Sequence, residues 1–358
     1  MVGALPNGGD PSRLLVKQLS RTFALTIPQL PPGLQEPVSV AYLLCRTVDT
    51  IEDSGLADPA AKASQLKSFL AALDDFAVTQ TVSEQLASEI SGRVTPEELN
   101  LIRHMPELLA SLNAHPPEQQ AAIRECLRKM ASGMSSYVDR PNGLADMREL
   151  DHYCYVVAGV VGEMLTELFR DHCSEINDHG SELRRLASSF GQGLQMTNIL
   201  KDIWDDYRQG QCWLPRDQFK AMNLDLRDLD TAARSPSFRP VILDITSTAL
   251  SHLDNAVEYT MLIPRHQTGI RRFCILAIGM AYATLNRLAR VPRFTPDCRI
   301  KIGRATVRNL MLAAPVLSRS NSLTRLTMRS LARNCHKQTD CVSFTNSDYA
   351  ASQATNLR

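Results

Sequence analysis

The sequence has few aromatic residues, no Cys-x-x-Cys pair and no long hydrophobic run. Aromatic residues make up only 6% of the 358 residues, and the longest apolar stretch, residues 273–283, is too short to cross a bilayer as a helix. The nine cysteines are odd in number, and none lies in a Cys-x-x-Cys pair. A disulfide framework is therefore not expected, and a reducing cytoplasm fits the cysteine content better.

Two further absences bear on localisation and on domain organisation. The first residues contain no basic region followed by an apolar core, so no signal peptide is expected. No Gly/Ser/Pro-rich linker divides the chain, which indicates one domain over residues 1–334. Residues 335–358 are rich in Ser, Thr, Asn and Gln, and are predicted to be a flexible tail.

Hydrophobic residues rarely alternate with a period of two and often repeat at three and four residues. Leu66, Phe69, Leu70 and Leu73 are an example, since this spacing places them on one face of a helix. Prolines divide the chain into about ten helical segments of ordinary length. The sequence therefore predicts an all-α fold.

Charge is unevenly distributed, although the net charge is only +1. The stretch 298–339 contains nine Lys or Arg residues and no Asp or Glu, and the remainder therefore has a net charge of −8. This stretch is either a solvated helix face or a contact for anionic lipid or a phosphorylated ligand. Nucleic acid is not an expected partner, because no aromatic residues interleave with these charges.

Two acidic clusters each occur at the end of a long apolar run. Their carboxylates recur at i, i+3 and i+4: Asp49, Glu52 and Asp53 in the first cluster, and Asp202, Asp205 and Asp206 in the second. On a helix this spacing places three like charges on one face, where they repel each other. Buried charge needs compensation, and Mg²⁺ supplies it because it binds carboxylates together with water and substrate phosphates. Two such faces opposed across a helical cavity would hold Mg²⁺ between the protein and a diphosphate.

Basic residues accompany both clusters. Arg46 lies three residues before Asp49, and Lys201 directly precedes Asp202. These cations would neutralise the charge that develops on a departing diphosphate, and Arg21 is a third candidate for this role. A structural network of salt bridges between the same cations and carboxylates is the alternative.

Small residues are closely spaced in the apolar segment around Tyr153 and Tyr155. Glycine is unfavourable inside a helix, so Gly159 and Gly162 indicate a close approach by another helix or by a ligand. Each tyrosine is either a core aromatic, a carbocation-stabilising ring or a proton-transfer group, and the residues alone leave this open. The amide of Asn198 lies one turn before the second acidic cluster, where it would hydrogen-bond a ligand or metal-bound water.

Four motifs occur in the order that is typical of squalene and phytoene synthases. They are Ser20–Phe23, Asp49–Asp53, Tyr153–Gly159 and Gln195–Asp206. The chain resembles this family from about Ser20 to Arg308, and is most similar to its squalene synthases of bacterial type. The resemblance implies a single-domain isoprenoid synthase helical bundle with a central cavity. It also implies an Mg²⁺-dependent enzyme that joins two farnesyl diphosphates head to head.

The resemblance implies roles for the residues singled out above. The six carboxylates of the two clusters would bind Mg²⁺ and the diphosphates. Tyr153 would assist the first half-reaction, and Tyr42 would line the cavity. Arg21 and Arg46 would bind diphosphate.

Members of the family differ in the fate of presqualene diphosphate, the cyclopropyl intermediate. Squalene synthases reduce it with NADPH, whereas dehydrosqualene and phytoene synthases lose a proton, and some bacterial relatives stop at the intermediate. The segment with Arg299 and Lys301 resembles the NADPH contact of the reducing branch, to which Asn198 and Lys201 would contribute. Two features depart from that pattern. Lys201 replaces an arginine of eukaryotic squalene synthases and lacks its bidentate fork, and Arg299 and Lys301 stand in reversed order.

The expected ligands are therefore two farnesyl diphosphates, with Mg²⁺ and NADPH as cofactors. We expect a monomer that is cytoplasmic or bound peripherally at the inner membrane face through the stretch 298–339. A metal-dependent phosphohydrolase fits less well, because no histidine lies in either acidic cluster. A helical lipid-binding protein without catalytic activity would not explain paired acidic faces inside apolar helices.

Overall fold

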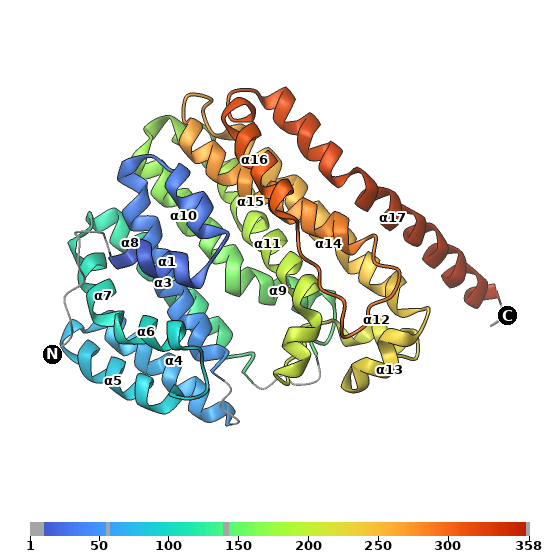
Figure 1. Cartoon of the computed structure of the whole chain (residues 1–358), viewed down its shortest axis with the longest axis horizontal. Coiled ribbons are helices and arrows are strands. Elements are labelled where there is room, and N and C mark those ends of the chain that lie inside the picture. The colour runs from blue at the N-terminus through green and yellow to red at the C-terminus, as the bar shows by residue number, and fades with distance from the viewer. Residues whose placement is uncertain (1–10, 55–57, 139–142, 356–358) are drawn as a thin grey trace. The chain divides into compact units, whose positions relative to one another are not determined.

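The computed structural model describes residues 11–54, 58–138 and 143–355, with side chains from residue 12 to residue 339 (Figure 1). Within these ranges every regular element is a helix, apart from an isolated bridge between Leu144 and Pro215. The prediction of an all-α fold is therefore confirmed. The chain forms two compact units: unit 1 is Met1–Asp139 with Glu163–Asp178, and unit 2 is Arg140–Gly162 with His179–Arg358.

Unit 1 is built from helices of moderate length and a few 3-10 turns. They are α1 (Pro11–Leu19), α2 (Phe23–Thr26), η1 (Ile27–Gln29), α3 (Pro32–Glu52), α4 (Pro59–Asp74), η2 (Phe76–Val78), α5 (Thr79–Ile90), α6 (Pro96–Arg103), α7 (Met105–Ala114), α8 (Pro117–Met134), most of α10 (Val160–His172) and most of η4 (Ser174–His179).

Helix α3 is the centre of unit 1. Its residues are mostly apolar on every side, and Leu43, Leu44 and Val48 are completely inaccessible to water. Helices α1, α4, α6, α7 and α8 all pack against it. A helix that is hydrophobic all round is stable only when neighbours cover it, which explains this central position.

Prolines mark the beginning of many helices. Pro32, Pro59, Pro96 and Pro117 are each the first residue of a helix, where the missing N–H would have no partner anyway. The described residues nevertheless form seventeen α-helices, whereas the prolines had indicated about ten helical segments. The expected number was too low because several helices end at breaks that prolines do not mark.

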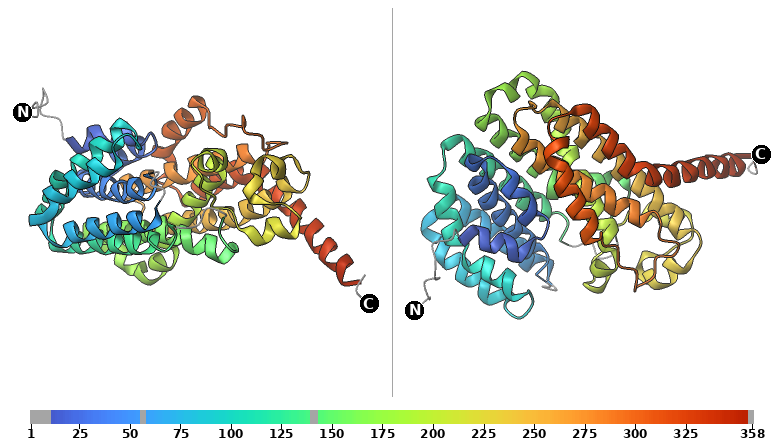
Figure 2. Two further views of the ribbon diagram at one scale, coloured as in Figure 1. Left: turned by 90° about the horizontal axis from the view of Figure 1, so that it is seen from below. Right: turned by 45° about the horizontal axis from the view of Figure 1, so that its top comes forward.

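Unit 2 is built from several long helices and several short ones. They are α9 (Met147–Cys154), η3 (Tyr155–Gly159), α11 (Gly180–Arg208), α12 (Arg216–Ala221), η5 (Leu226–Asp228), α13 (Leu229–Arg234), α14 (Phe238–Leu262), α15 (Thr268–Leu288), α16 (Arg304–Leu317) and α17 (Asn321–Thr355). Helix α11 packs along α14, and α15 and α17 pack against α14 in turn (Figure 2).

Helix α17 runs across the boundary at residues 334–335 that the sequence predicted between domain and tail. Cys335 and Thr339 are buried on it, and residues 356–358 of the predicted tail lie outside the described residues. Separately, no helix in the described part of the chain is long and apolar enough to cross a membrane.

Gly162 and Gly191 allow two helical segments of unit 2 to touch at the level of their backbones. A Cβ atom on Gly162 would lie 2.0 Å from the carbonyl oxygen of Ala187, and one on Gly191 would lie 1.8 Å from that of Ala158. The sequence left open whether Gly162 allows the close approach of another helix or of a ligand. The short distance to Ala187 favours the close approach of a helix. The segment η3 at this contact is a π-helix, a local widening that is often found at functional sites.

We expect Gly162→Ala to destabilise the protein by about 2–3 kcal/mol, because the added methyl group would clash with the backbone of Ala187 in α11. The matched control is Gly303→Ala, since Gly303 has an ordinary φ of −73° and no atom within 4 Å of an added Cβ. Urea denaturation followed by circular dichroism measures both variants. Equal effects of the two substitutions would contradict the packing argument.

The connection between α16 and α17 is fastened to the core by Arg271 of α15. Its guanidinium is completely buried. It donates to the carbonyl oxygens of Ser318 at 2.6 Å, Ile263 at 2.8 Å and Thr260 at 3.1 Å. It also donates to the side-chain oxygen of Asn321 at 2.7 Å. Burial lowers the pKa of this guanidinium, yet its hydrogen-bonding capacity is well used.

Candidate active site

One face of α3 carries a line of polar side chains in unit 1. Tyr42, Arg46, Asp49 and Asp53 are spaced by four, three and four residues, which places them on the same side of the helix. Asp53 is the C-cap of α3 and is exposed. Arg46 and Asp49 are partly buried and form an ion pair, with 3.8 Å between Arg46 Nη1 and Asp49 Oδ2.

Burial changes the acidity of this face. It raises the pKa of Asp49 to about 7, although the Arg46 guanidinium works in the opposite direction, and the charge of Asp53 raises the pKa further. Burial also raises the pKa of Tyr42 to about 12. A carboxyl group with such a pKa is incompletely compensated when it is ionised, and a bound cation would compensate it.

The first motif, Ser20–Phe23, packs against the same face. The hydroxyl of Ser20 accepts the backbone N–H of Phe23 at 3.1 Å, where the short helix α2 begins, and the Ser20 side chain counteracts the rise in the pKa of Tyr42. The rings of Phe23 and Tyr42 lie with their centroids 4.6 Å apart. Arg21 is exposed within this motif. The structure thus brings the first motif and the polar face of α3 together.

Glu52 does not share the accessible face on which the sequence predicted all three carboxylates of the first cluster. Its side chain is only 4% exposed, whereas Asp53 is exposed. A different carboxylate, Glu98 of α6, accepts a hydrogen bond from Arg46 Nη2 at 2.7 Å. Glu98 is fixed by a capping box with Thr95 at the beginning of α6. The salt-bridge alternative is therefore realised in part around Arg46.

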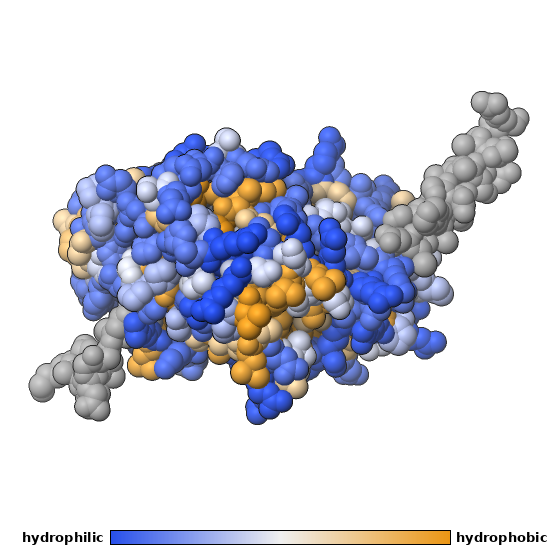
Figure 3. Space-filling model, turned by 90° about the horizontal axis from the view of Figure 1, so that it is seen from above, coloured by the Kyte–Doolittle hydropathy of each residue, from blue (hydrophilic) through white to orange (hydrophobic). Residues whose placement is uncertain are grey.

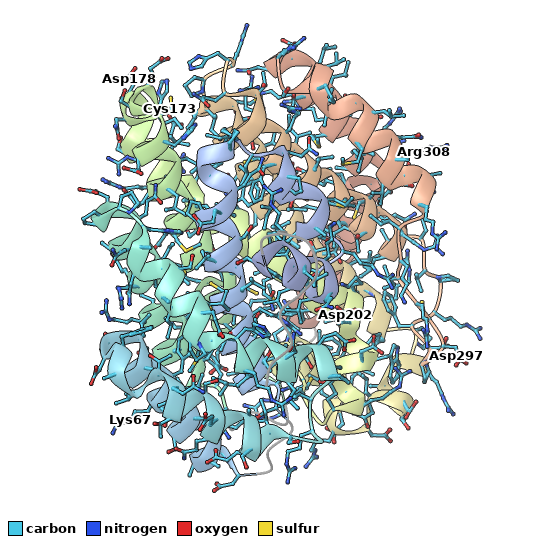
Figure 4. The ribbon with its side chains drawn as sticks, turned by 60° about the vertical axis from the view of Figure 1, so that its left-hand side comes forward. Lys67, Cys173, Asp178, Asp202, Asp297 and Arg308 are labelled. Atoms are coloured by element: carbon cyan, nitrogen blue, oxygen red, sulfur yellow. The ribbon has the colours of Figure 1, made fainter. Side chains whose placement is uncertain are left out.

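The second acidic cluster lies at the C-terminal end of α11 in unit 2 (Figure 4). Asp202 and Asp206 are partly buried and Asp205 is exposed. Lys201 Nζ lies 2.9 Å from Asp202 Oδ2, and Arg208 Nη1 lies 2.7 Å from Asp205 Oδ1. Two carboxylates of this cluster therefore carry a paired cation, which also agrees with the salt-bridge alternative.

A loop with basic residues is fastened to the same end of α11. The second guanidinium nitrogen of Arg208 donates to the carbonyl oxygen of Pro296 at 2.8 Å. This loop, residues 289–303, connects α15 to α16 and carries Arg299 and Lys301, both of which are exposed. Arg208 therefore links the acidic cluster to the segment that the sequence assigned to NADPH.

Asn198 and Lys201 extend this region by one turn of α11. Lys201 Nζ donates to Asn198 Oδ1 at 3.5 Å, so one ammonium group contacts both Asn198 and Asp202. Asn198 is exposed and Lys201 is partly buried. The structure brings these two predicted cofactor residues together on one helix face.

Tyr153 is held by a stacked ring in unit 2. Its side chain is 2% exposed, and its ring lies on that of Trp213, with centroids 4.1 Å apart and planes 10° apart. The helix that carries it, α9, is tied to α11 and α14 through Asp151. The Oδ1 atom of Asp151 accepts a hydrogen bond from Gln192 at 2.9 Å and lies 2.8 Å from His252 Nε2. Tyr153 is therefore firmly positioned.

Tyr155 has different surroundings. It lines an open cleft of about 540 Å³, together with Asp151 and His152 from the preceding helix α9 and Gln192 from α11. Tyr153 is not among the residues of this cleft. The two tyrosines, equivalent candidates in the sequence, thus occupy separate environments.

The donor atoms of the two clusters agree in kind with an Mg²⁺ site. Among the residues that the structure describes, no group of three or more His, Cys, Asp or Glu side chains is arranged as a metal site. Mg²⁺ needs only one or two carboxylates, however, and takes its other ligands from water and substrate phosphates. Asp49 and Asp53 in unit 1, and Asp202 and Asp206 in unit 2, supply carboxylate oxygens of this kind.

Residues 16–308 match the family model of squalene/phytoene synthase, which covers most of the chain. The chain belongs to the squalene/phytoene synthase family. It is 28% identical to the squalene synthase of Cyberlindnera jadinii, covering 90% of this chain and 71% of that protein. It is 29% identical to the squalene synthase of Saccharomyces cerevisiae, in an alignment that covers 85% of this chain and 66% of that protein. It is 30% identical to the squalene synthase of Solanum lycopersicum, in an alignment that covers 76% of this chain and 62% of that protein.

Comparison with solved structures identifies the fold of this chain. The structure of TcSQS in complex with a ligand aligns with a TM-score of 0.76 at 20% identity, covering 92% of this chain and 95% of that one. A dehydrosqualene synthase in complex with a ligand aligns with a TM-score of 0.57 at 19% identity, covering 85% and 94%. The chain therefore has the isoprenoid synthase helical fold, as the sequence predicted.

Three residues of this squalene/phytoene synthase family member were not recognised as site residues in the sequence. The pairing of Arg208 with Asp205 could have been recognised from the sequence, because the two residues lie three apart on the same helix. Glu98 carries the capping-box pattern with Thr95, which predicts a helix beginning but not a partner for Arg46. Trp213 gave no signal of its contact with Tyr153, since stacking across sixty residues leaves no local pattern.

Proposed function

We propose that this protein is a squalene synthase, which joins two farnesyl diphosphates through presqualene diphosphate and reduces this intermediate to squalene with NADPH. The observation that carries the proposal is the family match over residues 16–308, which includes both acidic clusters and Tyr153. Relatives named squalene synthase support the reducing branch. The family itself makes the chain a prenyltransferase.

The basic and acidic residues of the site would act on the diphosphate groups. The residues that would hold Mg²⁺ are Asp49, Glu52, Asp53, Asp202, Asp205 and Asp206. When bound, Mg²⁺ supplies positive charge that stabilises the leaving diphosphate. Arg21 and Arg46 would add fixed positive charge for the same group, and Arg46 is already oriented by Glu98 at 2.7 Å.

Tyr153 would act in the first half-reaction, in which one allylic cation attacks the double bond of the second molecule and a proton is lost. Its hydroxyl would take part in that proton transfer, and its ring would face positive charge. The stack on Trp213 limits the freedom of the ring and so fixes where the hydroxyl points. An apolar surrounding also excludes water, which would otherwise capture the cation.

We expect Tyr153→Phe to slow the formation of presqualene diphosphate by about a hundredfold, because general acid–base groups contribute on this scale. The matched control is Tyr155→Phe, which removes a hydroxyl from the neighbouring cleft and should change the rate less than about twofold. Single-turnover assays without NADPH isolate this half-reaction. A similar loss in both variants would assign the effect to packing.

Reduction would depend on the loop of residues 289–303 and the adjacent turn of α11. NADPH, when bound, supplies the hydride that quenches the final cation. Arg299 and Lys301 would hold its phosphate groups, and Asn198 and Lys201 would contact it from α11. The link between Arg208 and Pro296 supports this grouping, since it fastens the loop to the end of α11.

The alternative is a dehydrosqualene, phytoene or presqualene diphosphate synthase that acts without reductant. The observation in its favour is Lys201, which offers an ammonium group where the reducing enzymes of eukaryotes present a planar fork. The resemblance of the fold to a dehydrosqualene synthase is compatible with either branch.

Product analysis by gas chromatography–mass spectrometry tests the proposal. Purified protein is incubated with Mg²⁺ and either farnesyl diphosphate or a C20 diphosphate, with and without NADPH. Squalene that forms only with NADPH is the expected result. Dehydrosqualene or presqualene diphosphate in both reactions would support the alternative, and no condensation product from C15 or C20 substrates would overturn both.

We also propose that the enzyme is a cytoplasmic monomer whose basic stretch 298–339 contacts anionic lipid. The charge of this stretch and the apolar character of the proposed product support the contact.

A further inference from the structure

Large hydrophobic side chains are exposed at the turn between α16 and α17. Leu312 and Val316 of α16 are 72% and 61% exposed, and Leu323 and Leu326 of α17 are 45% and 67% exposed. They lie within fifteen residues of each other, on both sides of the connection at Ser318–Ser320. Single exposed leucines are ordinary on a protein surface, but four on one helical hairpin are not.

Helical spacing pairs these side chains on each of the two helices. Leu312 and Val316 are four residues apart and Leu323 and Leu326 are three apart, so each pair shares a face of its helix. Other residues of the same helices are buried, namely Leu310, Ala314 and Leu317 of α16 and Met328 of α17. Each helix of the hairpin α16–α17 therefore exposes apolar side chains as well as burying them.

Positive charge borders the outer face of the hairpin. Arg308 lies one turn before Leu312, Arg319 lies in the connection, and Arg329 lies three residues after Leu326; all three are exposed. Figure 4 shows Arg308 projecting outward from α16. Figure 3 shows hydrophobic patches bordered by strongly hydrophilic side chains in the view from above. No acidic residue occurs between residues 298 and 339.

The acidic groups that face the hairpin come from α14. Glu258 accepts two hydrogen bonds from Arg325, at 3.0 and 2.6 Å, and Asp254 lies 3.8 Å from His336. Arg325 is therefore engaged on the inner side of α17, and it is not counted among the outward cations.

The hairpin is also rigid at its turn. Arg271 binds the carbonyl oxygen of Ser318 and the side chain of Asn321, and so fixes the end of α16 and the beginning of α17 to α15. A surface that inserts into lipid benefits from such fixation, because side chains that are already ordered lose less entropy on binding.

We infer that the hairpin α16–α17 is a docking element for an anionic lipid bilayer. Leu312, Val316, Leu323 and Leu326 enter the boundary between headgroups and acyl chains, and Arg308, Arg319 and Arg329 bind the lipid phosphates. The inference deepens the lipid contact proposed above, because it assigns the contact to four apolar anchors in addition to charge. A soluble acidic partner would be matched by the arginines but would not require apolar anchors.

Flotation with lipid vesicles tests this assignment, and it needs neither substrate nor cofactor, so its failure would leave the synthase proposal intact. The full chain is mixed with vesicles of phosphatidylcholine alone, or of phosphatidylcholine with phosphatidylglycerol. We expect binding to the anionic vesicles and much less to the neutral ones. The double variant L312S/L326S should bind at least about tenfold more weakly, because two leucines no longer enter the bilayer.

Matched controls come from unit 1. Phe76 is 50% exposed, and F76S should not change binding. Likewise R308Q/R319Q should weaken binding to anionic vesicles about tenfold or more, whereas K67Q at an exposed lysine of α4 should not. Circular dichroism confirms that each variant is folded.

Three outcomes would overturn the assignment: no binding to anionic vesicles, equal losses in F76S and L312S/L326S, or a dimer in light scattering that L312S/L326S dissociates. In the last case the hairpin would be an interface between two copies of this chain.

Discussion

Asp202→Asn is expected to lower the turnover of farnesyl diphosphate by about a thousandfold at saturating substrate. The substitution keeps the size of the side chain but removes the negative charge that a hard cation requires. The carboxylate is partly exposed, at 37% of its side-chain surface, so it is accessible to a ligand. Measurement of turnover over a range of Mg²⁺ concentrations should show a weaker dependence on Mg²⁺ as well as a lower maximum.

The control for Asp202→Asn is Glu182→Gln at the other end of the same helix. Glu182 is an exposed carboxylate within 3.9 Å of Arg185, and it lies in the first turn of α11. An exposed pair of this kind contributes little to stability, so this variant should keep its turnover within about twofold.

The same pair of variants separates a catalytic role from the salt-bridge alternative. If the contact of Asp202 with Lys201 were only structural, Asp202→Asn would change the denaturation midpoint and leave turnover nearly intact. A loss of turnover with an unchanged midpoint supports the metal role. Turnover reduced by less than about threefold would contradict the proposed function of this cluster.

The amino-acid sequence predicted the fold and the order of the motifs because these depend on local patterns. Hydrophobic spacing at three and four residues predicts helices, and the carboxylate spacings predicted that all three carboxylates of each cluster would share a face. Both apolar runs are helical, as α3 and α11, but in the first cluster only Asp49 and Asp53 lie on the polar face of α3, since Glu52 is buried.

Features that depend on tertiary contacts were not predictable in this way. Glu52 has the spacing of a surface carboxylate but faces the core, because α3 is covered on nearly every side by neighbouring helices. Glu98 binds Arg46 across 52 residues of sequence. Pro37 and Pro315 lie inside α3 and α16, where a proline is locally unfavourable. In each case packing outweighs the local preference.

Arg271 belongs to the same class, because nothing in its surroundings in the sequence indicates complete burial. The structure gives Arg271 a structural task, since its hydrogen bonds connect the end of α14, the turn after α16 and the beginning of α17.

Arg271→Met is therefore expected to destabilise the protein by about 3–5 kcal/mol, because removal of one partner leaves several buried acceptors unsatisfied. Methionine fills a similar volume, so the loss would come from the hydrogen bonds and not from a cavity. The carbonyl oxygens of Thr260, Ile263 and Ser318 would each lose a donor at 3.1 Å or less. Urea denaturation followed by circular dichroism measures the free energy of unfolding.

Two further variants decide whether the hydrogen bonds or the charge of Arg271 matter. Arg271→Lys keeps the charge, but its single ammonium group cannot reach all the acceptors that the planar guanidinium binds. This variant should therefore recover only part of the stability that Arg271→Met loses. The neighbouring Arg272→Met is the control, because Arg272 is partly exposed and donates to Thr268 within its own helix. It should change the free energy of unfolding by less than about 1 kcal/mol. If Arg271→Lys were as stable as the unaltered chain, charge rather than the fork would hold the hairpin α16–α17 in place.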